Sequence, residues 1–410
     1  MAAELMVDIE ELYKDLHRNP ELSFAEHRTA GIVAERLTAL GYEVTTGVGR
    51  TGVVGVLENG DGPTVLLRAD MDGLPVREAT GLDYASTARG TADGEEVPVM
   101  HACGHDVHVA CLIGAAERLV SERSMWSGTV VAVFQPAEEF GIGAVTMIED
   151  GLFERFPKPD IVLGQHVGPA PAGVLGAHAG PAFAATDDVT VRLVGRGGHG
   201  SRPETTIDPV VMAAATVMRL QGIVAREVAG SDTAVVTVGT MRAGSKTNII
   251  PPDATLGINV RTYQPEIRDR VLTAIERIAR AEAAASGAEH EPEIARSNSF
   301  AALVNDPDAT ERTMEAFRAH FGEERVIDPG ALTGSEDVGE LATGAGVPIV
   351  YWILGGADAE AFAAATAADR VEQDIPSNHS PYFAPVIQPT LATGIEALTV
   401  AATTWLGPAR

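Results

Sequence analysis

The sequence predicts a large α/β domain interrupted by a smaller α+β domain. Strand-like and helix-like segments alternate over residues 1–182 and again over 299–410, the pattern of a mixed sheet flanked by helices. Residues 183–298 differ, because their segments follow the order β-α-β-β-α-β of a split βαβ, ferredoxin-like sandwich. We therefore expect a first domain built from two parts of the chain, with the second domain inserted between them.

Hydrophobic periodicity places the elements of the first part. The expected helices are residues 8–16, 26–40 and 107–121, and the expected strands are 42–45, 53–57, 64–68, 129–134 and 161–164. Gly41 is a natural end for the second helix. Residues 59–63, Asn-Gly-Asp-Gly-Pro, have the chemistry of a hairpin or a tight turn. In an α/β sheet of this kind, functional side chains gather at the carboxyl ends of strands.

The inserted domain is predicted from a different pattern. Val189, Val191 and Leu193 alternate with polar residues, as in a half-buried strand. The expected strands are 189–193, 233–241, 254–261 and 293–296, and the expected helices are 208–228 and 266–286. After residue 299 the chain returns to α/β character.

Composition excludes several classes of partner. The 410 residues include 30 Lys and Arg against 57 Asp and Glu, a formal net charge of -27. Such a chain repels phosphate backbones and anionic membrane surfaces, so we expect neither nucleic acid nor membrane as a partner. No apolar run approaches a membrane span, and no signal peptide is visible. Only two cysteines occur, which favours a reducing compartment and a cytoplasmic location.

A short motif, Met100-His101-Ala102-Cys103-Gly104-His105-Asp106, carries the first chemical signal. Cys103 and His105 are two positions apart, close enough to bind one cation, and Gly104 lets the backbone turn between them. The helix that follows adds a positive N-terminal end, which favours the thiolate. A lone Cys or His is more often a core residue, but the cluster indicates a metal site.

A second motif, Gln135-Pro136-Ala137-Glu138-Glu139, follows a predicted buried strand. Two adjacent carboxylates there are unfavourable unless a cation neutralises them or one of them holds a proton. Asp70 and His166 also follow predicted strands, so the same sheet edge should carry them. His166 and His379 are each ambiguous alone.

Together these residues resemble the M20 metallopeptidase family, in its branch of aminoacylases, hippurate hydrolases and auxin-conjugate hydrolases. The resemblance extends from about residue 9 to about residue 398. Its motifs are residues 68–75, 100–106 with His108, 135–139, 198–201 with Pro203, 248–251, 257–261, 335–337 and 378–381. The chain departs from the usual pattern in a longer segment at 355–378 and in lacking an acidic pair after Phe383.

The resemblance implies a first, catalytic domain with a binuclear metal site and a lid or dimerisation domain inserted into it. The metal ligands it implies are Cys103, His105, Glu139, His166 and His379. It assigns Glu138 as the general base, which takes a proton from a water between the metals and later returns one to the departing amine. The two divalent ions per subunit would be Zn or Mn, with Co and Ni left open.

Four further residues are implied less directly. In relatives the histidine equivalent to His199 reaches an active site, often across a dimer, and helps to hold the developing oxyanion. Asn248 and Arg261 lie in the same inserted domain, and a guanidinium suits a substrate carboxylate. Asp70 is expected to orient a ligand histidine from behind. The domain that carries His199 makes a homodimer, or a tetramer built from it, the expected assembly.

We expect hydrolysis of the amide bond of a small N-acyl amino acid. Two alternatives stay open. One is a metallo-dipeptidase or aminopeptidase of the same family, and the other is a metal-dependent binding protein without turnover. An intact Glu138 argues against the latter, because a pure binder needs no free base beside its metals.

Overall fold

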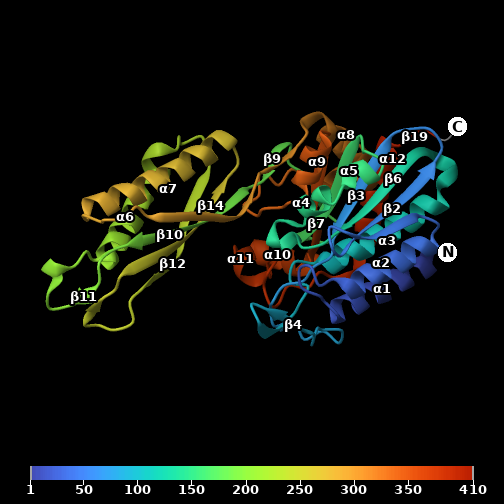
Figure 1. Ribbon diagram of the computed structural model, residues 1–410. Coiled ribbons are helices and arrows are strands. Elements are labelled where there is room, and N and C mark those ends of the chain that lie inside the picture. The colour runs from blue at the N-terminus through green and yellow to red at the C-terminus, as the bar shows by residue number, and fades with distance from the viewer. Residues whose placement is uncertain (1, 409–410) are drawn as a thin grey trace. The chain divides into compact units, whose positions relative to one another are not determined.

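A mixed nine-stranded sheet organises the larger of the two units into which the chain divides in the computed structural model, which describes residues 2–408 (Figure 1). This unit comprises the chain up to Ala182, Val304–Gly330 and the part from Asp337 onward. The smaller unit comprises Phe183–Leu303 and Ala331–Glu336. The predicted fold class, an α/β domain interrupted by an α+β domain, is confirmed.

The large sheet has the order β1-β2-β6-β3-β7-β18-β8-β17, and β19 pairs with β6. Its strands are β1 (Glu43–Val48), β2 (Gly52–Asn59), β3 (Thr64–Asp70), β6 (Trp126–Gln135), β7 (Ile161–Pro171), β8 (Leu175–Gly176), β17 (Val326–Ile327), β18 (Ile349–Ala357) and β19 (Gly407–Pro408). The central pairs β6–β3, β3–β7 and β7–β18 are parallel, so the carboxyl ends of these strands share one edge.

The helices of the larger unit are α1 (Ala2–Arg18), α2 (His27–Ala39), α3 (His105–Ser121), α4 (Gly143–Glu149), α5 (Leu152–Arg155), α8 (Pro307–Phe321), α9 (Gly339–Ala345), α10 (Ala359–Ala367), α11 (Val371–Asp374) and α12 (Ile387–Trp405). A separate hairpin pairs β4 (Arg89–Ala92) with β5 (Glu95–Pro98). The chain passes between the units through β9 (Gly180–Phe183) and β16 (Leu303–Asn305).

The hairpin suggested for residues 59–63 is wrong, although a turn does form there. β2 and β3 are not neighbours, because β6 lies between them, antiparallel to β2 and parallel to β3. The turn chemistry of Asn-Gly-Asp-Gly-Pro specifies a reversal of the chain, but it does not specify that the flanking strands pair. Burial decides that point: all of β6 except Thr129 is buried, so it occupies the interior of the sheet.

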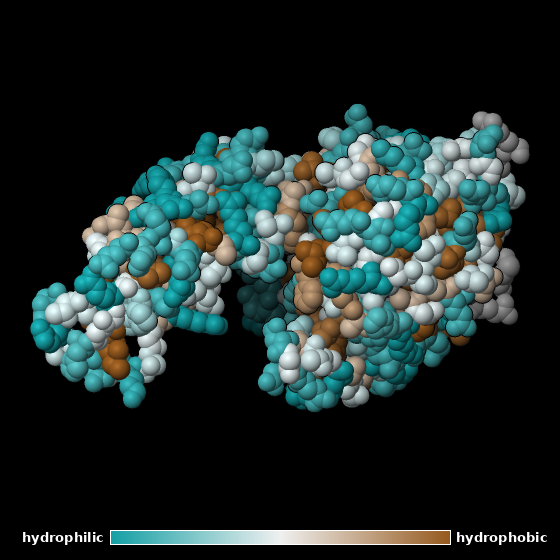
Figure 2. Space-filling view, viewed as in Figure 1, coloured by the Kyte–Doolittle hydropathy of each residue, from teal (hydrophilic) through white to brown (hydrophobic). Residues whose placement is uncertain are grey.

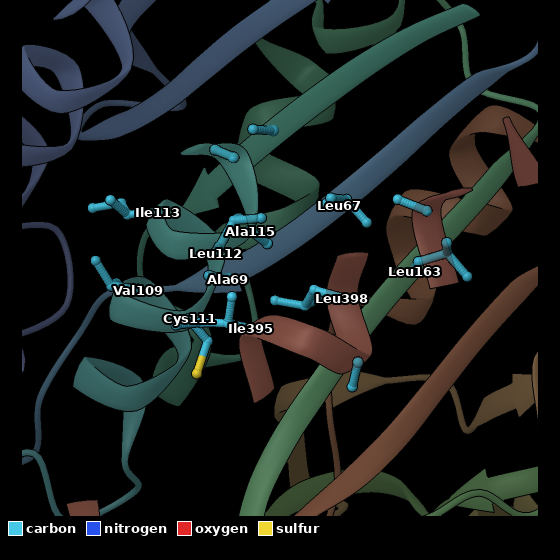
Figure 3. Close-up of a cluster of buried hydrophobic side chains, with 14 of the residues drawn as sticks. Leu67, Ala69, Val109, Cys111, Leu112, Ile113, Ala115, Leu163, Ile395 and Leu398 are labelled. Carbon is cyan, nitrogen blue, oxygen red and sulfur yellow. The ribbon is translucent and has the colours of Figure 1, made fainter. Parts of the chain in front are cut away.

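The core of the larger unit lies between this sheet and helices α3 and α12 (Figure 3). Leu67 and Ala69 of β3 and Leu163 of β7 point toward Leu112 of α3 and Leu398 of α12. The alternate residues of β3, among them Arg68 and Asp70, therefore point to the other face of the sheet.

The smaller unit is a four-stranded antiparallel sheet of order β12-β14-β10-β15 with two helices. Its elements are β10 (Ala185–Val194), α6 (Pro209–Glu227), β12 (Ala234–Ala243), β14 (Asp253–Thr262), α7 (Pro265–Ala285) and β15 (Glu293–Phe300), with the short pair β11 (Gly198–His199) and β13 (Ile249–Ile250). Alternate residues of β10 and β14 join both helices in one apolar core.

Figure 2 shows that hydrophilic residues predominate on the visible surface of both units, as the excess of acidic residues leads one to expect. Between residues 2 and 408, none of the helices combines the length and the apolar character that crossing a bilayer requires.

We predict that Gly394→Ala destabilises the larger unit. A Cβ atom at Gly394 would lie 2.6 Å from Cys111 Sγ and 2.8 Å from Leu354 Cδ2, where α12 packs on α3 and β18. Overpacking of this kind lowers the free energy of unfolding by about 1–3 kcal/mol. Thermal denaturation would measure the fall.

Gly31→Ala is the matched control, because it is also a helical glycine of the larger unit but has no atom within 4 Å of the added Cβ. It should raise stability by about 0.5–1 kcal/mol. Equal melting temperatures for the two variants would contradict the packing at Gly394.

Candidate active site

Side chains from four separate segments meet at the carboxyl edge of the large sheet. Cys103 lies two residues before α3, and His105 is the first residue of that helix. His166 lies on β7, two residues after Gly164, which pairs with Arg68 of β3. The remaining members of the group are Glu138 and Glu139, in a short 3-10 turn after β6, and His379, in the loop before α12. The structure thus brings all five predicted ligands and Glu138 together.

The distances between ligand atoms suit a metal ion. Cys103 Sγ lies 3.5 Å from His166 Nε2 and 3.3 Å from His379 Nε2, which in turn lies 3.4 Å from Glu139 Oε1. Tetrahedral ligands at about 2.0–2.3 Å from an ion are about 3.3–3.8 Å apart. Among the described residues, five groups of three side chains have ligand atoms within 4.8 Å of one another, and two of these groups, Cys103-His105-His166 and Cys103-Glu139-His379, share the sulfur.

Several buried polar atoms of the site make no hydrogen bond to the residues that the structure describes, among them His105 Nε2 and Glu139 Oε1. His105 Nε2 lies 3.9 Å from Glu138 Oε2 and 4.0 Å from Glu139 Oε1, both too long for a hydrogen bond. Within residues 2–408, neither His105 Nε2 nor Glu139 Oε1 makes a hydrogen bond. Since such atoms are rare unless a ligand engages them, these residues fit a divalent ion.

The negative charge of the site also favours a bound divalent ion. Burial opposes protonation of His105, but Asp70, Asp72 and Glu139 outweigh it and raise the pKa of His105 to about 10. This shift reports a strong negative potential at the imidazole. Burial lowers the pKa of His166 to about 4, so its imidazole is neutral and suited to bind a metal.

The sequence analysis expects Asp70 to orient a ligand histidine, but the histidine closest to Asp70 is His108, which is outside the predicted ligand set. Asp70 Oδ1 lies 2.5 Å from His108 Nδ1, whereas Asp70 Oδ2 is 3.6 Å from His105 Nε2. His108 Nε2 accepts the backbone N–H of Val167 at 2.8 Å. His108 therefore connects β3 to the residue after His166, and both of its ring nitrogens are engaged.

The sequence analysis missed Asp72, which supports both halves of the site. Its two oxygens accept the backbone N–H groups of Glu138 and Glu139, each at 3.1 Å. Asp72 Oδ1 also lies 3.3 Å from His105 Nδ1, and Ser23 donates to Oδ2 at 2.6 Å. A second carboxylate two positions after Asp70 was the available signal.

Asn378, named only as part of a motif, connects three ligand segments. Its amide donates to the carbonyl oxygens of Cys103 at 3.2 Å and Val167 at 3.0 Å. The next residue, His379, has a left-handed backbone with φ 69° and donates its N–H to Ala102 at 2.8 Å. These bonds hold His379 against the α3 start.

The smaller unit carries the other three predicted residues in two places. His199 is exposed on β11, its Nδ1 contacts Ser201 Oγ at 2.8 Å, and Gly200 donates its N–H to the carbonyl of Asn248 at 2.8 Å. Arg261 lies near the far end of β14, eight residues from its start. Its guanidinium donates to Asn259 Oδ1 at 3.0 Å and to Ser335 Oγ. Within this unit His199 and Asn248 are neighbours, and Arg261 is remote.

Thiolate, imidazole and carboxylate groups clustered at the strand ends of an α/β sheet are the side chains of a hydrolytic enzyme site. Residues 66–379 match the model of peptidase family M20/M25/M40. The chain belongs to this family, and it is a hydrolase that acts on amide or peptide bonds.

Similarity to known proteins supports this family assignment. The chain is 39% identical to the hippurate hydrolase of Campylobacter jejuni, over 82% of this chain and 85% of the relative. It is 36% identical to thermostable carboxypeptidase 2 of Saccharolobus solfataricus, over 84% and 85%. A dinuclear metal binding peptidase of the M20 family from Bacillus subtilis has a similar structure, with a TM-score of 0.77 and 27% identity over 98% of this chain and 100% of that one.

We predict that Zn²⁺ or Mn²⁺ raises the melting temperature of the metal-free protein, because an ion that binds only the folded state stabilises it by mass action. At a free ion concentration of 100 times Kd, the gain is about 2.7 kcal/mol. His105→Gln should reduce the shift, and differential scanning calorimetry would measure it.

His178→Gln is the control, since His178 pairs with Asp328 at 2.9 Å on the surface of the same unit. It should keep the full shift. A shift that survives in His105→Gln would place the ion elsewhere.

Proposed function

We propose that the protein hydrolyses N-acyl amino acids to a carboxylate and a free amino acid, using two divalent metal ions held by Cys103, His105, Glu139, His166 and His379. The observation that carries this proposal is Glu138, a carboxylate beside the ligand cluster. Its Oε2 lies 3.9 Å from His105 Nε2 on the same short turn as Glu139. The similar structure described as dinuclear metal binding supports the number of ions.

Glu138 and Glu139 would have different roles, proton transfer and metal binding. Glu139 Oε1 lies within 4.0 Å of both His105 and His379, so we assign it to the metals. Bound divalent ions supply Lewis-acid chemistry and lower the pKa of water. Glu138 takes the proton from the attacking water and then delivers a proton to the amine nitrogen as the C–N bond breaks. One carboxylate thus serves as base and then as acid.

The relatives and Arg261 support this substrate class. Hippurate is itself an N-acylated amino acid, so the hippurate hydrolase supports a free carboxylate and an amide in the substrate. A guanidinium such as that of Arg261 can bind this carboxylate bidentately. The carboxypeptidase relative favours a peptide with a free C-terminus as the second candidate, and a dipeptidase or aminopeptidase would need an acidic site for the substrate ammonium.

The proposal also covers the kind of metal ion and the cellular compartment. A site with one thiolate, imidazoles and a carboxylate suits Zn or Mn, with Co and Ni as alternatives. Cys103 and Cys111 are both buried, and neither forms a disulfide bond. A cytoplasmic, reducing setting would keep Cys103 available as a thiolate.

We further propose a homodimer in which His199 serves the partner's site. His199 and Asn248 lie near the start of β14 and Arg261 near its end, a separation of roughly 27 Å for eight strand residues. One small substrate cannot contact both places on one chain, whereas two copies can supply one place each. The edge strand β12 and the exposed Val211 and Met218 of α6 offer a self-complementary surface for such a dimer.

We predict that the wild-type protein releases amino acid from acetyl, benzoyl and long-chain acyl derivatives and that Glu138→Gln lowers kcat by about 10²–10⁴-fold. The amide keeps the size of the side chain but accepts no proton. Release from a panel loaded with Zn, Mn, Co or Ni would be measured, with matched dipeptides alongside.

Faster release from the dipeptides would favour the peptidase. No release from any member, with metal bound, would favour a binding protein. Glu138→Gln with unchanged kcat would remove Glu138 as the base.

A complementation assay tests His199. His199→Ala should lose about 10²–10³-fold in kcat by removing an oxyanion donor, with metal content unchanged. When His199→Ala and Glu138→Gln chains are combined in one dimer, about half of the wild-type activity should return, because one of two sites is then intact. No recovery in verified heterodimers would mean that His199 acts within its own chain.

A further inference from the structure

Glu26, on the connection between α1 and α2, is a fully buried carboxylate that neither the ligand set nor the proposed chemistry uses. Its Oε1 accepts the backbone N–H of Ala137 at 2.8 Å, across 111 positions of sequence. Its Oε2 accepts the Thr51 hydroxyl at 2.5 Å. Both carboxylate oxygens thus accept hydrogen bonds from residues outside the α1–α2 connection.

Ala137 is the residue directly before Glu138, and its backbone is left-handed, with φ 50° and ψ 43°. For a residue with a Cβ atom this conformation is unfavourable by about 1–2 kcal/mol. It turns the chain from the end of β6 into the short 3-10 turn that carries both glutamates. The surroundings must therefore hold Ala137 in place.

Three consecutive N–H groups of this turn donate to two buried carboxylates. Ala137 donates to Glu26, and Glu138 and Glu139 donate to Asp72. Asp72 lies against His105, so it belongs to the site already described. The Glu26 carboxylate hydrogen-bonds to the strained Ala137 and to Thr51, and its charge also acts on Asp72. Substitution of Glu26 alone therefore tests its hydrogen bond to the turn.

A structural role as the cap of α2 does not account for Glu26. It precedes α2, but its side chain makes no capping hydrogen bond. That role belongs to Glu21, whose oxygens accept the N–H groups of Arg28 at 2.9 Å and Thr29 at 2.8 Å. A buried carboxylate is unfavourable unless its hydrogen bonds compensate, and here the compensating backbone bond is the one to Ala137.

We propose that Glu26 is a positioning residue that sets the direction of the Glu138 carboxylate by holding Ala137 in its left-handed conformation. The proposal rests on the role of Glu138 as the base. In the described part of the chain, residues 2–408, its carboxylate hydrogen-bonds to Ala137 and Thr51 and not to a proposed metal ligand. Its loss should therefore lower kcat while metal content and KM stay close to those of the wild type. A misplacement of about 1 Å at a reacting group lowers the rate by as much as 10²-fold.

The test is suppression by a second substitution. Glu26→Ala should lower kcat by about 10–100-fold. Ala137→Gly in the same chain should restore most of the loss, because glycine adopts the left-handed conformation without the Cβ penalty. Glu26→Gln should stay close to the wild type, since its carbonyl oxygen can accept from Ala137 while its amide donates to Thr51.

Glu21→Ala is the matched control on the same connection. It should lower the melting temperature by removing the α2 cap, with kcat unchanged. If Glu26→Ala does not fold, Glu26→Asp replaces it, because one methylene less prevents the carboxylate from reaching both partners. Circular dichroism, metal content, kcat and KM would be measured for every variant below its melting temperature.

Either of two results would overturn the proposal: an unchanged kcat in the Glu26 variant, or a lowered kcat that Ala137→Gly does not restore. Glu138→Gln, assayed in parallel, distinguishes failure of the positioning role of Glu26 from failure of the proposed function. If Glu138→Gln is inactive and Glu26→Ala fully active, only the positioning role fails. If Glu138→Gln is active, the base assignment fails whatever Glu26 does.

Discussion

Negative charge buried at the carboxyl edge of the large sheet is the constraint on which the rest of the site depends. Asp70 and Asp72 are at most 1% exposed, and Glu138 is 7% exposed. Arg68 compensates part of this charge by pairing with Asp70 at 2.6 Å and with Asp337 at 3.2 Å. Burial opposes ionisation of Asp70, but Arg68 and the neighbouring histidines still hold the pKa of its carboxyl well below the ordinary value. The remaining negative potential acts on His105, whose side chain reaches the centre of the group. A divalent cation is the species that this potential attracts most strongly.

Hydrogen bonds to the buried carboxylates also determine which histidines can still bind a metal ion. His108 has both ring nitrogens engaged, by Asp70 and by the N–H of Val167. Burial lowers its pKa to about 4, so it is a neutral ring with a fixed tautomer. His108 lies beside His105 and His166, and an imidazole is a common metal ligand. Both of its ring nitrogens are hydrogen-bonded, however, so neither has a lone pair left for a metal ion. His105 differs because its Nε2 has no such partner. Hydrogen bonding, rather than residue type, therefore distinguishes the supporting His108 from the proposed ligand His105.

The sequence predicts local features well and long-range ones poorly. Periodicity and strand-end placement are local, and they were enough to bring Cys103, His105 and the two glutamates to one sheet edge. The insertion of β6 between β2 and β3 depends on which strands bury both faces, and the turn at residues 59–63 carries no information on that. The role of Glu26 is equally hard to predict, since its partner Ala137 is 111 positions away and Glu26 itself lies outside the motifs of the sequence analysis. Asp72 was accessible in principle, because a carboxylate in the buried segment after Asp70 requires a partner.

The division of the chain into two units separates the proposed metal ligands and base from three residues proposed to contact the substrate. Every proposed metal ligand, Glu138 and the carboxylates that hold them lie in the larger unit. His199, Asn248 and Arg261 lie in the smaller one, where the antiparallel sheet fixes Arg261 at the opposite end of β14 from the other two. A strand of this length is rigid compared with a loop, so one copy of the smaller unit holds these residues at a fixed separation that exceeds the size of an acyl amino acid. If all three contact one substrate, that separation requires two copies of the chain, and the need for a dimer then follows from the length of β14.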